Sequence, residues 1–128
     1  MFVQIHAQGI TRKVLFLGNS YTGVNNLPQL IADLATSTGD TLIFESYTPG
    51  GYTLDQHLAD SVSTNKIKSG GWDFVVLQDQ SQVPASPEYS GYGATYLSAL
   101  IKEHAPCART LFYMTWGRQN GDAMNCAA

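Results

Sequence analysis

Apolar residues along the chain follow two alternating patterns. Four short apolar runs are bounded by Gly, Pro or polar residues, which is typical of strands buried in a parallel sheet. Between these runs, apolar residues recur every three or four positions, which is typical of amphipathic helices. The predicted strands lie within residues 13–19, 41–47, 73–78 and 110–115, and the predicted helices cover about 27–38, 53–66 and 91–104.

Each predicted helix has a boundary signal and an apolar face. Pro28 suits the first turn of a helix, where its missing N–H would have no partner, and Gly39 ends that helix. We expect the following residues to face the core: Leu27, Leu30, Ile31, Leu34 and Ala35 in the first helix; Leu54, Leu58 and Val62 in the second; Leu97, Leu100 and Ile101 in the third.

Strands and helices therefore alternate in the order β-α-β-α-β-α-β. This order predicts a three-layer α/β/α sandwich with a parallel sheet, flavodoxin-like in the broad sense. No helix is predicted after Trp116 to cover the fourth strand. We therefore expect this fold to be C-terminally incomplete at Ala128.

Composition limits the classes of function. The chain has 128 residues, of which 44% are hydrophobic and 13% are charged, and this is typical of one globular domain. Its net charge is −3 and it has no basic stripe, so we expect no nucleic-acid partner. No apolar run is long enough to span a bilayer, so we expect no membrane partner. The sequence does not predict the oligomeric state.

The two ends of the chain leave alternatives open. Residues 1–12 are interpreted as a flexible leader or the remnant of a signal peptide, and residues 13–128 as the domain. Cys107 and Cys126 are either free thiols or one disulfide, and their spacing matches no metal site.

Small and polar residues follow three of the predicted strands. They are Ser20 after the first strand, Gly51 after the second, and Gln78 and Gln80 after the third. Ligands of an open parallel sheet bind beyond the carboxyl ends of its strands, so we expect these residues to meet at one edge. Each feature alone is common in loops, and the hypothesis of a site depends on the combination.

The combination favours acyl-transfer chemistry. The Ser20 hydroxyl could attack an acyl carbon once a base removes its proton. The backbone N–H groups of Ser20 and Gly51, with the side-chain amide of Gln80 or Gln78, would form an oxyanion hole. We favour Gln80 as the amide donor because it lies further into the loop.

These segments resemble the SGNH hydrolases, also called GDSL-like esterases. Residues 14–22, Val-Leu-Phe-Leu-Gly-Asn-Ser-Tyr-Thr, resemble the first block of that family, and Gly51-Tyr52-Thr53 resembles the second. Residues 72–81 take the place of the third block but lack its oxyanion Asn. Residues 77–81 and 114–122 resemble a secreted bacterial branch whose substrates are poorly defined.

The resemblance implies a serine ester hydrolase. The substrate would be a small-molecule or carbohydrate ester, with deacylation of O-acetyl carbohydrate or similar small esters as the expected reaction. Neither an organic cofactor nor a metal is implied. The secreted branch further implies an extracytoplasmic location and a bond between Cys107 and Cys126.

The block that supplies the base in this family is absent from the sequence. The family uses Asp-x-x-His near its C-terminus, and no such motif follows Thr115. Of the three histidines, His6 lies in the expected leader. His57 is expected on the surface of the second helix or partly packed, and His104 near the end of the third. We therefore expect residues 1–128 alone to be weakly active or inactive.

Two rival hypotheses remain. The loop from Gly18 to Gly23 resembles the hydroxyl-rich phosphate loop of flavodoxins, which favours an FMN-binding module. Against this rival, residues 24–27 separate the loop from the next helix. In the second rival, the chain is an inactive fragment that keeps the oxyanion hole but lacks the base.

Overall fold

The computed structural model describes residues 8–85 and 87–116 and shows a four-stranded parallel sheet in the order β2-β1-β3-β4. The prediction of an α/β fold with a parallel sheet is confirmed. The elements in chain order are β1 (Thr11–Leu17), α1 (Ser20–Gly23), α2 (Leu27–Ser37), β2 (Thr41–Tyr47), α3 (Leu54–Ala59), α4 (Ser61–Lys68), β3 (Phe74–Leu77), the 3-10 helix η1 (Val83–Ala85), α5 (Pro87–His104) and β4 (Arg109–Phe112).

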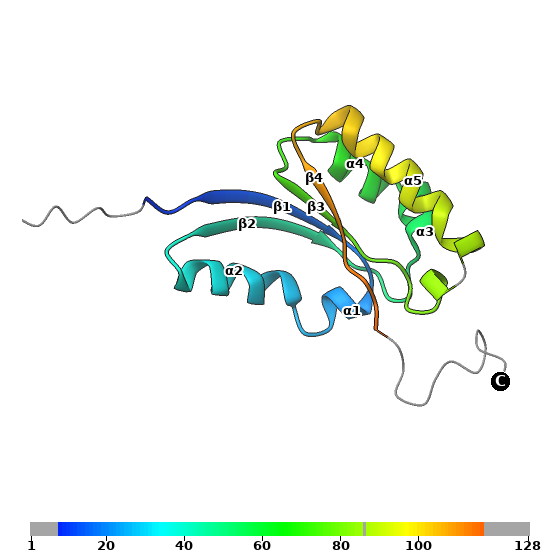
Figure 1. Cartoon of the computed structure of the whole chain (residues 1–128), viewed down its shortest axis with the longest axis horizontal. Coiled ribbons are helices and arrows are strands. Elements are labelled where there is room, and N and C mark those ends of the chain that lie inside the picture. The colour runs from blue at the N-terminus through cyan, green and yellow to red at the C-terminus, as the bar shows by residue number, and fades with distance from the viewer. Residues whose placement is uncertain (1–7, 86, 117–128) are drawn as a thin grey trace, which may run out of the picture.

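The sheet is covered on both faces. Figure 1 shows α1 and α2 on one face and α3, α4 and α5 on the other. β1 pairs with β2 on one side and with β3 on the other, so the chain reverses its direction of travel across the sheet at β1. In an open α/β sheet, the crevice at such a reversal is where ligands bind.

Alternating residues of the strands divide between the two faces. Leu15 and Leu17 of β1 join the main core cluster with Leu97 and Ile101 of α5, and all four are almost fully buried. Val14 and Phe16 are also buried but lie outside that cluster. The face covered by α3, α4 and α5 therefore holds the larger core.

The first predicted helix is present, but its apolar face differs from the prediction. Leu30 and Leu34 are exposed, with 56% and 67% of their surface accessible, whereas Pro28 and Ala32 are buried. The helix packs its smaller residues against β2, so its buried face is rotated relative to the one defined by the leucines. The expectation that Leu30 and Leu34 face the core was wrong.

The second predicted helix is two helices. The chain breaks at Asp60, whose extended backbone separates α3 from α4, and its carboxylate accepts a hydrogen bond from the Val62 N–H at 2.7 Å. An N-cap of this kind starts a new helix with a new rotational phase. Val62 is consequently exposed, and Ser63 and Ile67 are buried instead. The third predicted helix is confirmed, with Leu97 and Ile101 inward and its start four residues earlier than expected, at Pro87.

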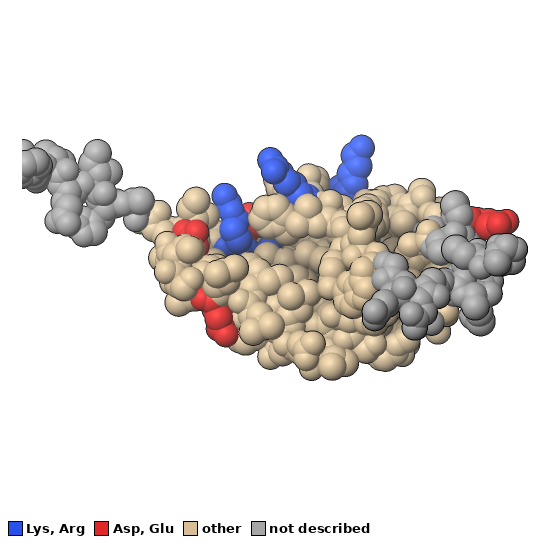
Figure 2. Space-filling view, turned by 60° about the horizontal axis from the view of Figure 1, so that its bottom comes forward, with Lys and Arg blue, Asp and Glu red and all other residues tan. Residues whose placement is uncertain are grey.

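The first strand begins before the expected domain boundary. β1 starts at Thr11, which pairs with Thr41, so the sheet begins two residues before Lys13, the expected first residue of the domain. Figure 2 shows one face of the molecule, on which the basic side chains stand apart and form no continuous patch. Within the described residues, no helix combines the length and apolar character that crossing a membrane requires.

Candidate active site

The three predicted loops meet at the carboxyl edge of the sheet. Asn19, directly before Ser20, donates a hydrogen bond from its side-chain Nδ2 to the Tyr52 carbonyl at 2.9 Å, and Tyr52 directly follows Gly51. The same Nδ2 donates to the Asp79 carbonyl at 3.2 Å, in the loop after β3. One buried asparagine therefore joins the loops after β1, β2 and β3, and it places Ser20 and Gly51 at the same edge.

Gln78, the first residue after β3, adds further hydrogen bonds between the loops after β1 and β3. Its Oε1 accepts hydrogen bonds from the Asn19 N–H at 3.0 Å and from the Thr22 hydroxyl at 2.9 Å. Its Nε2 donates to Asn19 Oδ1 at 2.9 Å and to the Asp79 carbonyl. Gln78 is fully buried and both ends of its amide are engaged, so it holds the loops together and has no free N–H for an oxyanion.

Replacing Gln78 with Leu is expected to destabilise the protein by about 3 kcal/mol, because several buried polar groups would lose their partners. Urea unfolding followed by circular dichroism measures the change. Gln29→Leu is the matched control, since Gln29 is exposed on α2 and its side chain donates to Asp33 of the same helix. It should shift stability by less than about 0.5 kcal/mol. Equal effects of the two substitutions would contradict this account.

Ser20 is the first residue of α1 and its side chain is exposed. The Asn19 side chain caps the Tyr21 N–H at 3.2 Å. The Ser20 N–H makes no hydrogen bond within the described part of the chain. Both the hydroxyl and the backbone donor of Ser20 are therefore free to contact a ligand.

Gly51 is exposed and has a φ of +72°. Such a positive φ favours glycine, because a Cβ would strain the backbone. Its N–H has no partner among the described residues either. The predicted second donor of the oxyanion hole thus lies at the correct edge in an accessible position.

Gln80 differs from Gln78 in having a free amide nitrogen. Its Oε1 accepts hydrogen bonds from the N–H groups of Gln82 at 2.7 Å and Val83 at 3.3 Å. These two backbone donors fix which end of the amide is the oxygen. Nε2 has no partner within residues 8–85 and 87–116, so Gln80 is the glutamine that can donate to a ligand.

His57 is completely buried, so the expectation of a surface or partly packed residue was wrong. The imidazole ring contacts the segment just before Ser20, where Nε2 donates to the Gly18 carbonyl at 2.8 Å. Nδ1 accepts a hydrogen bond from the Ser63 hydroxyl at 2.7 Å. The break at Asp60 brings Ser63 to this position. With both nitrogens occupied, His57 orients the loop and is not available as a base for Ser20.

Burial lowers the pKa of His57, an effect only partly offset by its hydrogen bond to Gly18. A lowered pKa means that the unfolded chain binds more protons than the folded chain as the pH falls below about 6.5. We therefore expect His57 to reduce the free energy of unfolding between about pH 7 and pH 5.

Urea unfolding at several pH values tests this expectation through the slope of stability against pH. His57→Gln should flatten the slope, and His104→Gln, at the partly exposed end of α5, should leave it unchanged. An identical slope in the unmodified chain and in His57→Gln would overturn the assignment. Asp79, whose pKa is raised by burial, contributes with the opposite sign in all three proteins, and because the charge of His57 acts on that pKa, the flattening in His57→Gln reports the two groups together.

No described histidine can act on Ser20. His104 ends α5 next to the start of β4, which places it at the amino edge of the sheet, opposite Ser20. His6 lies outside the described residues, as does Cys126, so the pairing with the exposed Cys107 stays a prediction. No cluster of three or more His, Cys, Asp or Glu side chains suited to a metal ion occurs in the part of the chain that the structure describes.

Asp79 is a buried acid that sequence reasoning missed. Its Oδ1 accepts from the N–H groups of Leu54 at 3.0 Å and Gln80 at 2.8 Å, and burial raises the pKa of its carboxyl despite these bonds. The sequence feature that could have identified Asp79 is its position just after a buried strand, next to Gln78. Its hydrogen bonds connect the start of α3 to the loop that holds Gln80.

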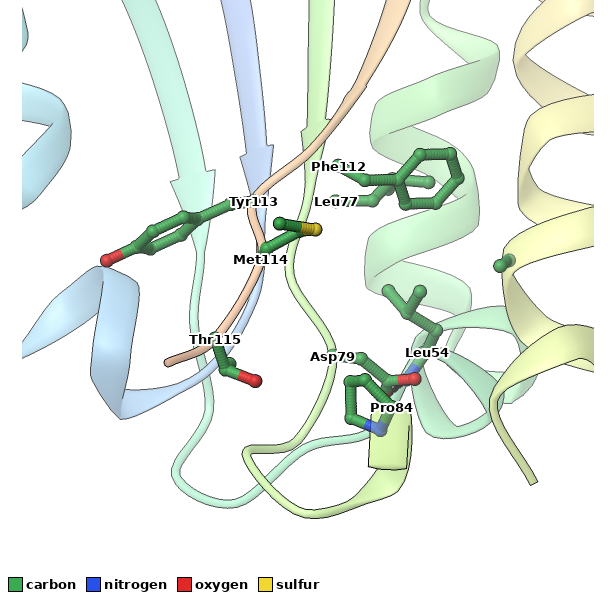
Figure 3. A pocket seen from close by; sticks show the side chains of 9 residues that line it. Leu54, Leu77, Asp79, Pro84, Phe112, Tyr113, Met114 and Thr115 are labelled. Atoms are coloured by element: carbon green, nitrogen blue, oxygen red, sulfur yellow. Dashed lines mark hydrogen bonds between the residues drawn. The ribbon is translucent and has the colours of Figure 1, made fainter. Parts of the chain in front are cut away.

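An apolar cavity of about 230 Å³ lies beside Asp79. Figure 3 shows side chains from β3, β4, α3 and the loop after β3 around it, with Met114 and Thr115 beyond the end of β4. The full lining is Leu54, Leu77, Asp79, Pro84, Ala94, Phe112, Tyr113, Met114 and Thr115. The cavity opens at the same edge of the sheet as Ser20, because its lining includes residues that follow β3 and β4.

The loop from Gly18 to Gly23 is less open than the flavodoxin hypothesis requires. Thr22 is buried and its hydroxyl is bonded to Gln78, so it cannot contact a phosphate. Gly18 is also buried, and a Cβ there would lie 2.7 Å from the Thr22 hydroxyl oxygen. Among the hydroxyls of Ser20 and Thr22, only that of Ser20 is exposed.

The fold and the strand order define a parallel α/β protein whose polar loops meet at the carboxyl edge of the sheet. A solved structure described as a DUF4886 family protein from Bacteroides uniformis has the same fold, with a TM-score of 0.71 and 19% sequence identity. The match covers 84% of this chain and 51% of that one, so the chain spans about half the length of its structural relative. No family model and no curated protein matches the chain.

Proposed function

We propose that the chain contributes the nucleophile and the oxyanion hole of an SGNH-type serine ester hydrolase. The observation that carries the proposal is that one sheet edge holds three donors with no partner among the described residues: the Ser20 N–H, the Gly51 N–H and the Gln80 Nε2. Donors held in place before the substrate arrives stabilise the charge that develops on a carbonyl oxygen. The exposed Ser20 hydroxyl lies in the same loop as the first donor.

The surrounding network supports this proposal because it fixes the loops that present the donors. Asn19 and Gln78 tie the Ser20 loop to its neighbours, and His57 holds the Gly18 carbonyl. Gln80 is held in place through its Oε1, which leaves its Nε2 available to donate to a ligand. Rigid support of this kind is what an oxyanion hole requires, since donors that must reorganise lose their advantage.

In the proposed reaction, the Ser20 oxygen forms a bond to the acyl carbon while its proton passes to a base. The tetrahedral oxyanion is held by the three donors and collapses as the bond to the leaving alcohol breaks and that oxygen takes a proton. Water then attacks the acyl-serine and releases the carboxylic acid. Substrates of this class are small acyl esters, with O-acetyl groups of carbohydrates as the family analogy.

Binding of FMN is the weaker alternative. A flavodoxin-like phosphate site depends on backbone N–H groups and hydroxyls that face the ligand. Burial of Thr22 removes one of those hydroxyls. A colourless purified protein with no absorbance in the flavin bands would count against this alternative, and a yellow protein would favour it.

Hydrolysis of p-nitrophenyl acetate tests the function. A serine without an adjacent base is a weak nucleophile, so the rate should be low but above that of buffer. Ser20→Ala should remove this excess rate. Ser81→Ala is the matched control, since Ser81 also follows a strand at this edge but has no assigned role; its rate should equal that of the unmodified chain. A rate that survives Ser20→Ala would refute the assignment.

A further inference from the structure

We propose that the cavity beside Asp79 is an acyl pocket, which receives the alkyl part of acyl groups longer than acetyl, such as butyryl or hexanoyl. This inference rests on the proposed function, because it assumes that Ser20 attacks an ester. It goes further by naming the part of the substrate that the protein selects.

The lining of the cavity suits an alkyl chain. Leu54, Leu77, Ala94 and Phe112 contribute apolar surface from α3, β3, α5 and β4. The cavity volume of about 230 Å³ exceeds the roughly 150 Å³ of an apolar protein cavity that holds benzene. A short acyl chain is therefore of the right size, whereas an acetyl group would leave most of the space unfilled.

The one acid in the lining is compatible with an apolar ligand. Asp79 is 7% exposed, and its Oδ1 already accepts two backbone N–H groups. Burial also raises the pKa of its carboxyl, so the neutral form persists to higher pH than for an exposed aspartate. Two hydroxyl-bearing residues also belong to the lining. The Thr115 hydroxyl donates to the Ser81 carbonyl at 3.3 Å and so points to the loop after β3, and Figure 3 shows the Tyr113 ring pointing away from Leu54 and Asp79.

One chain neighbour of Ser20 contacts a residue of the cavity lining, and the other contacts a residue that directly follows the lining in sequence. On one side, Asn19 Nδ2 donates to the carbonyl of Asp79, a lining residue. On the other side, the Tyr21 ring stacks on the Trp116 ring, with centroids 4.6 Å apart and planes 7° apart, and Trp116 directly follows the lining residue Thr115. These two contacts connect the Ser20 loop to the cavity side of the sheet edge, and the proposal is that the alkyl part of a bound acyl group enters the cavity from there.

The test compares kcat/KM for p-nitrophenyl acetate and hexanoate, each corrected for the rate of Ser20→Ala. A fully buried methylene improves transition-state binding by up to about fourfold, so four partly buried methylenes should favour hexanoate by at least about tenfold. Ala94→Leu fills the cavity and should abolish this preference while leaving the acetate rate within about twofold. Ala99→Leu, on the exposed side of the same helix, is the matched control and should change neither rate.

A binding measurement keeps the test independent of turnover. Hexanamide, a neutral analogue of the acyl group, should shift the methyl NMR signals of Ala94 and Met114, and acetamide should not. Ser20-dependent hydrolysis without a chain-length preference, or no shift with hexanamide, would overturn the acyl pocket and leave the esterase proposal standing. Shifts with hexanamide but no Ser20-dependent hydrolysis would instead count against the proposed function.

Discussion

A version of the chain continued through an Asp-x-x-His segment is expected to hydrolyse p-nitrophenyl acetate at least about 10³-fold faster than residues 1–128 alone. The reason is that no imidazole among the described residues can reach Ser20: His57 is buried with both nitrogens bonded, and His104 lies at the opposite edge of the sheet. Among the described residues, only an unactivated Ser20, substrate binding and the proposed oxyanion hole remain to accelerate the reaction.

The comparison needs four proteins: residues 1–128, the continued version and the Ser20→Ala variant of each. The continued version should be active and should lose that activity on Ser20→Ala. If residues 1–128 turn over at ordinary enzyme rates and Ser20→Ala abolishes them, then His6, His57 or His104 is the base, and the expectation that residues 1–128 lack a base is wrong. If Ser20→Ala leaves the continued version active, the nucleophile is another residue.

In that continued version, Gln80→Glu is expected to lower kcat by about 10²- to 10³-fold with little change in KM. The substitution keeps an oxygen that accepts from the N–H groups of Gln82 and Val83, but it removes the amide donor. The oxyanion develops only in the transition state, so the loss should appear in kcat.

Gln29→Glu on the surface of α2 controls for the change of charge and should leave kcat within about twofold, because it lies outside the site. Thermal unfolding of Gln80→Glu checks that the loop remains folded. A kcat within about threefold of the parent would show that Gln80 does not contact the oxyanion. Neither glutamine within residues 77–81 would then be an available donor, because both N–H groups of the Gln78 amide are already engaged.

The fold was predictable because its signals are local. Apolar runs bounded by turns mark strands, and their alternation with amphipathic segments dictates a parallel sheet. The faces of individual helices were less predictable. Leu30 and Leu34 follow a helical spacing, but α2 packs through Ala32 and Pro28, and nothing in the local spacing shows which face a neighbouring strand will cover.

The break at Asp60 shows the same limit. Asp60 followed by Ser61 is a sequence signal for the start of a helix. The helical spacing of Leu54, Leu58 and Val62 nevertheless favoured one continuous helix across this position. The tertiary bonds of Asp60 to the hydroxyls of Tyr47 and Tyr52, at 2.9 and 3.1 Å, favour the break. Tertiary contacts of this kind cannot be read from the spacing of apolar residues.

The location of the candidate site could be predicted from the strand ends, but the hydrogen bonds within the site could not. That Ser20 and Gly51 share an edge is a consequence of parallel strands. The difference between Gln78 and Gln80 depends on which side chain points into the protein, and the roles of His57 and Asp79 depend on contacts more than 20 residues apart in sequence. A single sequence shows these residues but not their partners.

Trapping of the acylated protein is the most direct test of the central claim that Ser20 is the nucleophile. Without a base, deacylation should also be slow, so incubation with p-nitrophenyl butyrate followed by acid quenching should preserve the adduct. Peptide mass spectrometry should locate the butyryl group on Ser20 and find it absent from that peptide in Ser20→Ala. Butyrylation confined to lysines or to other serines, with Ser20 unmodified, would contradict the account.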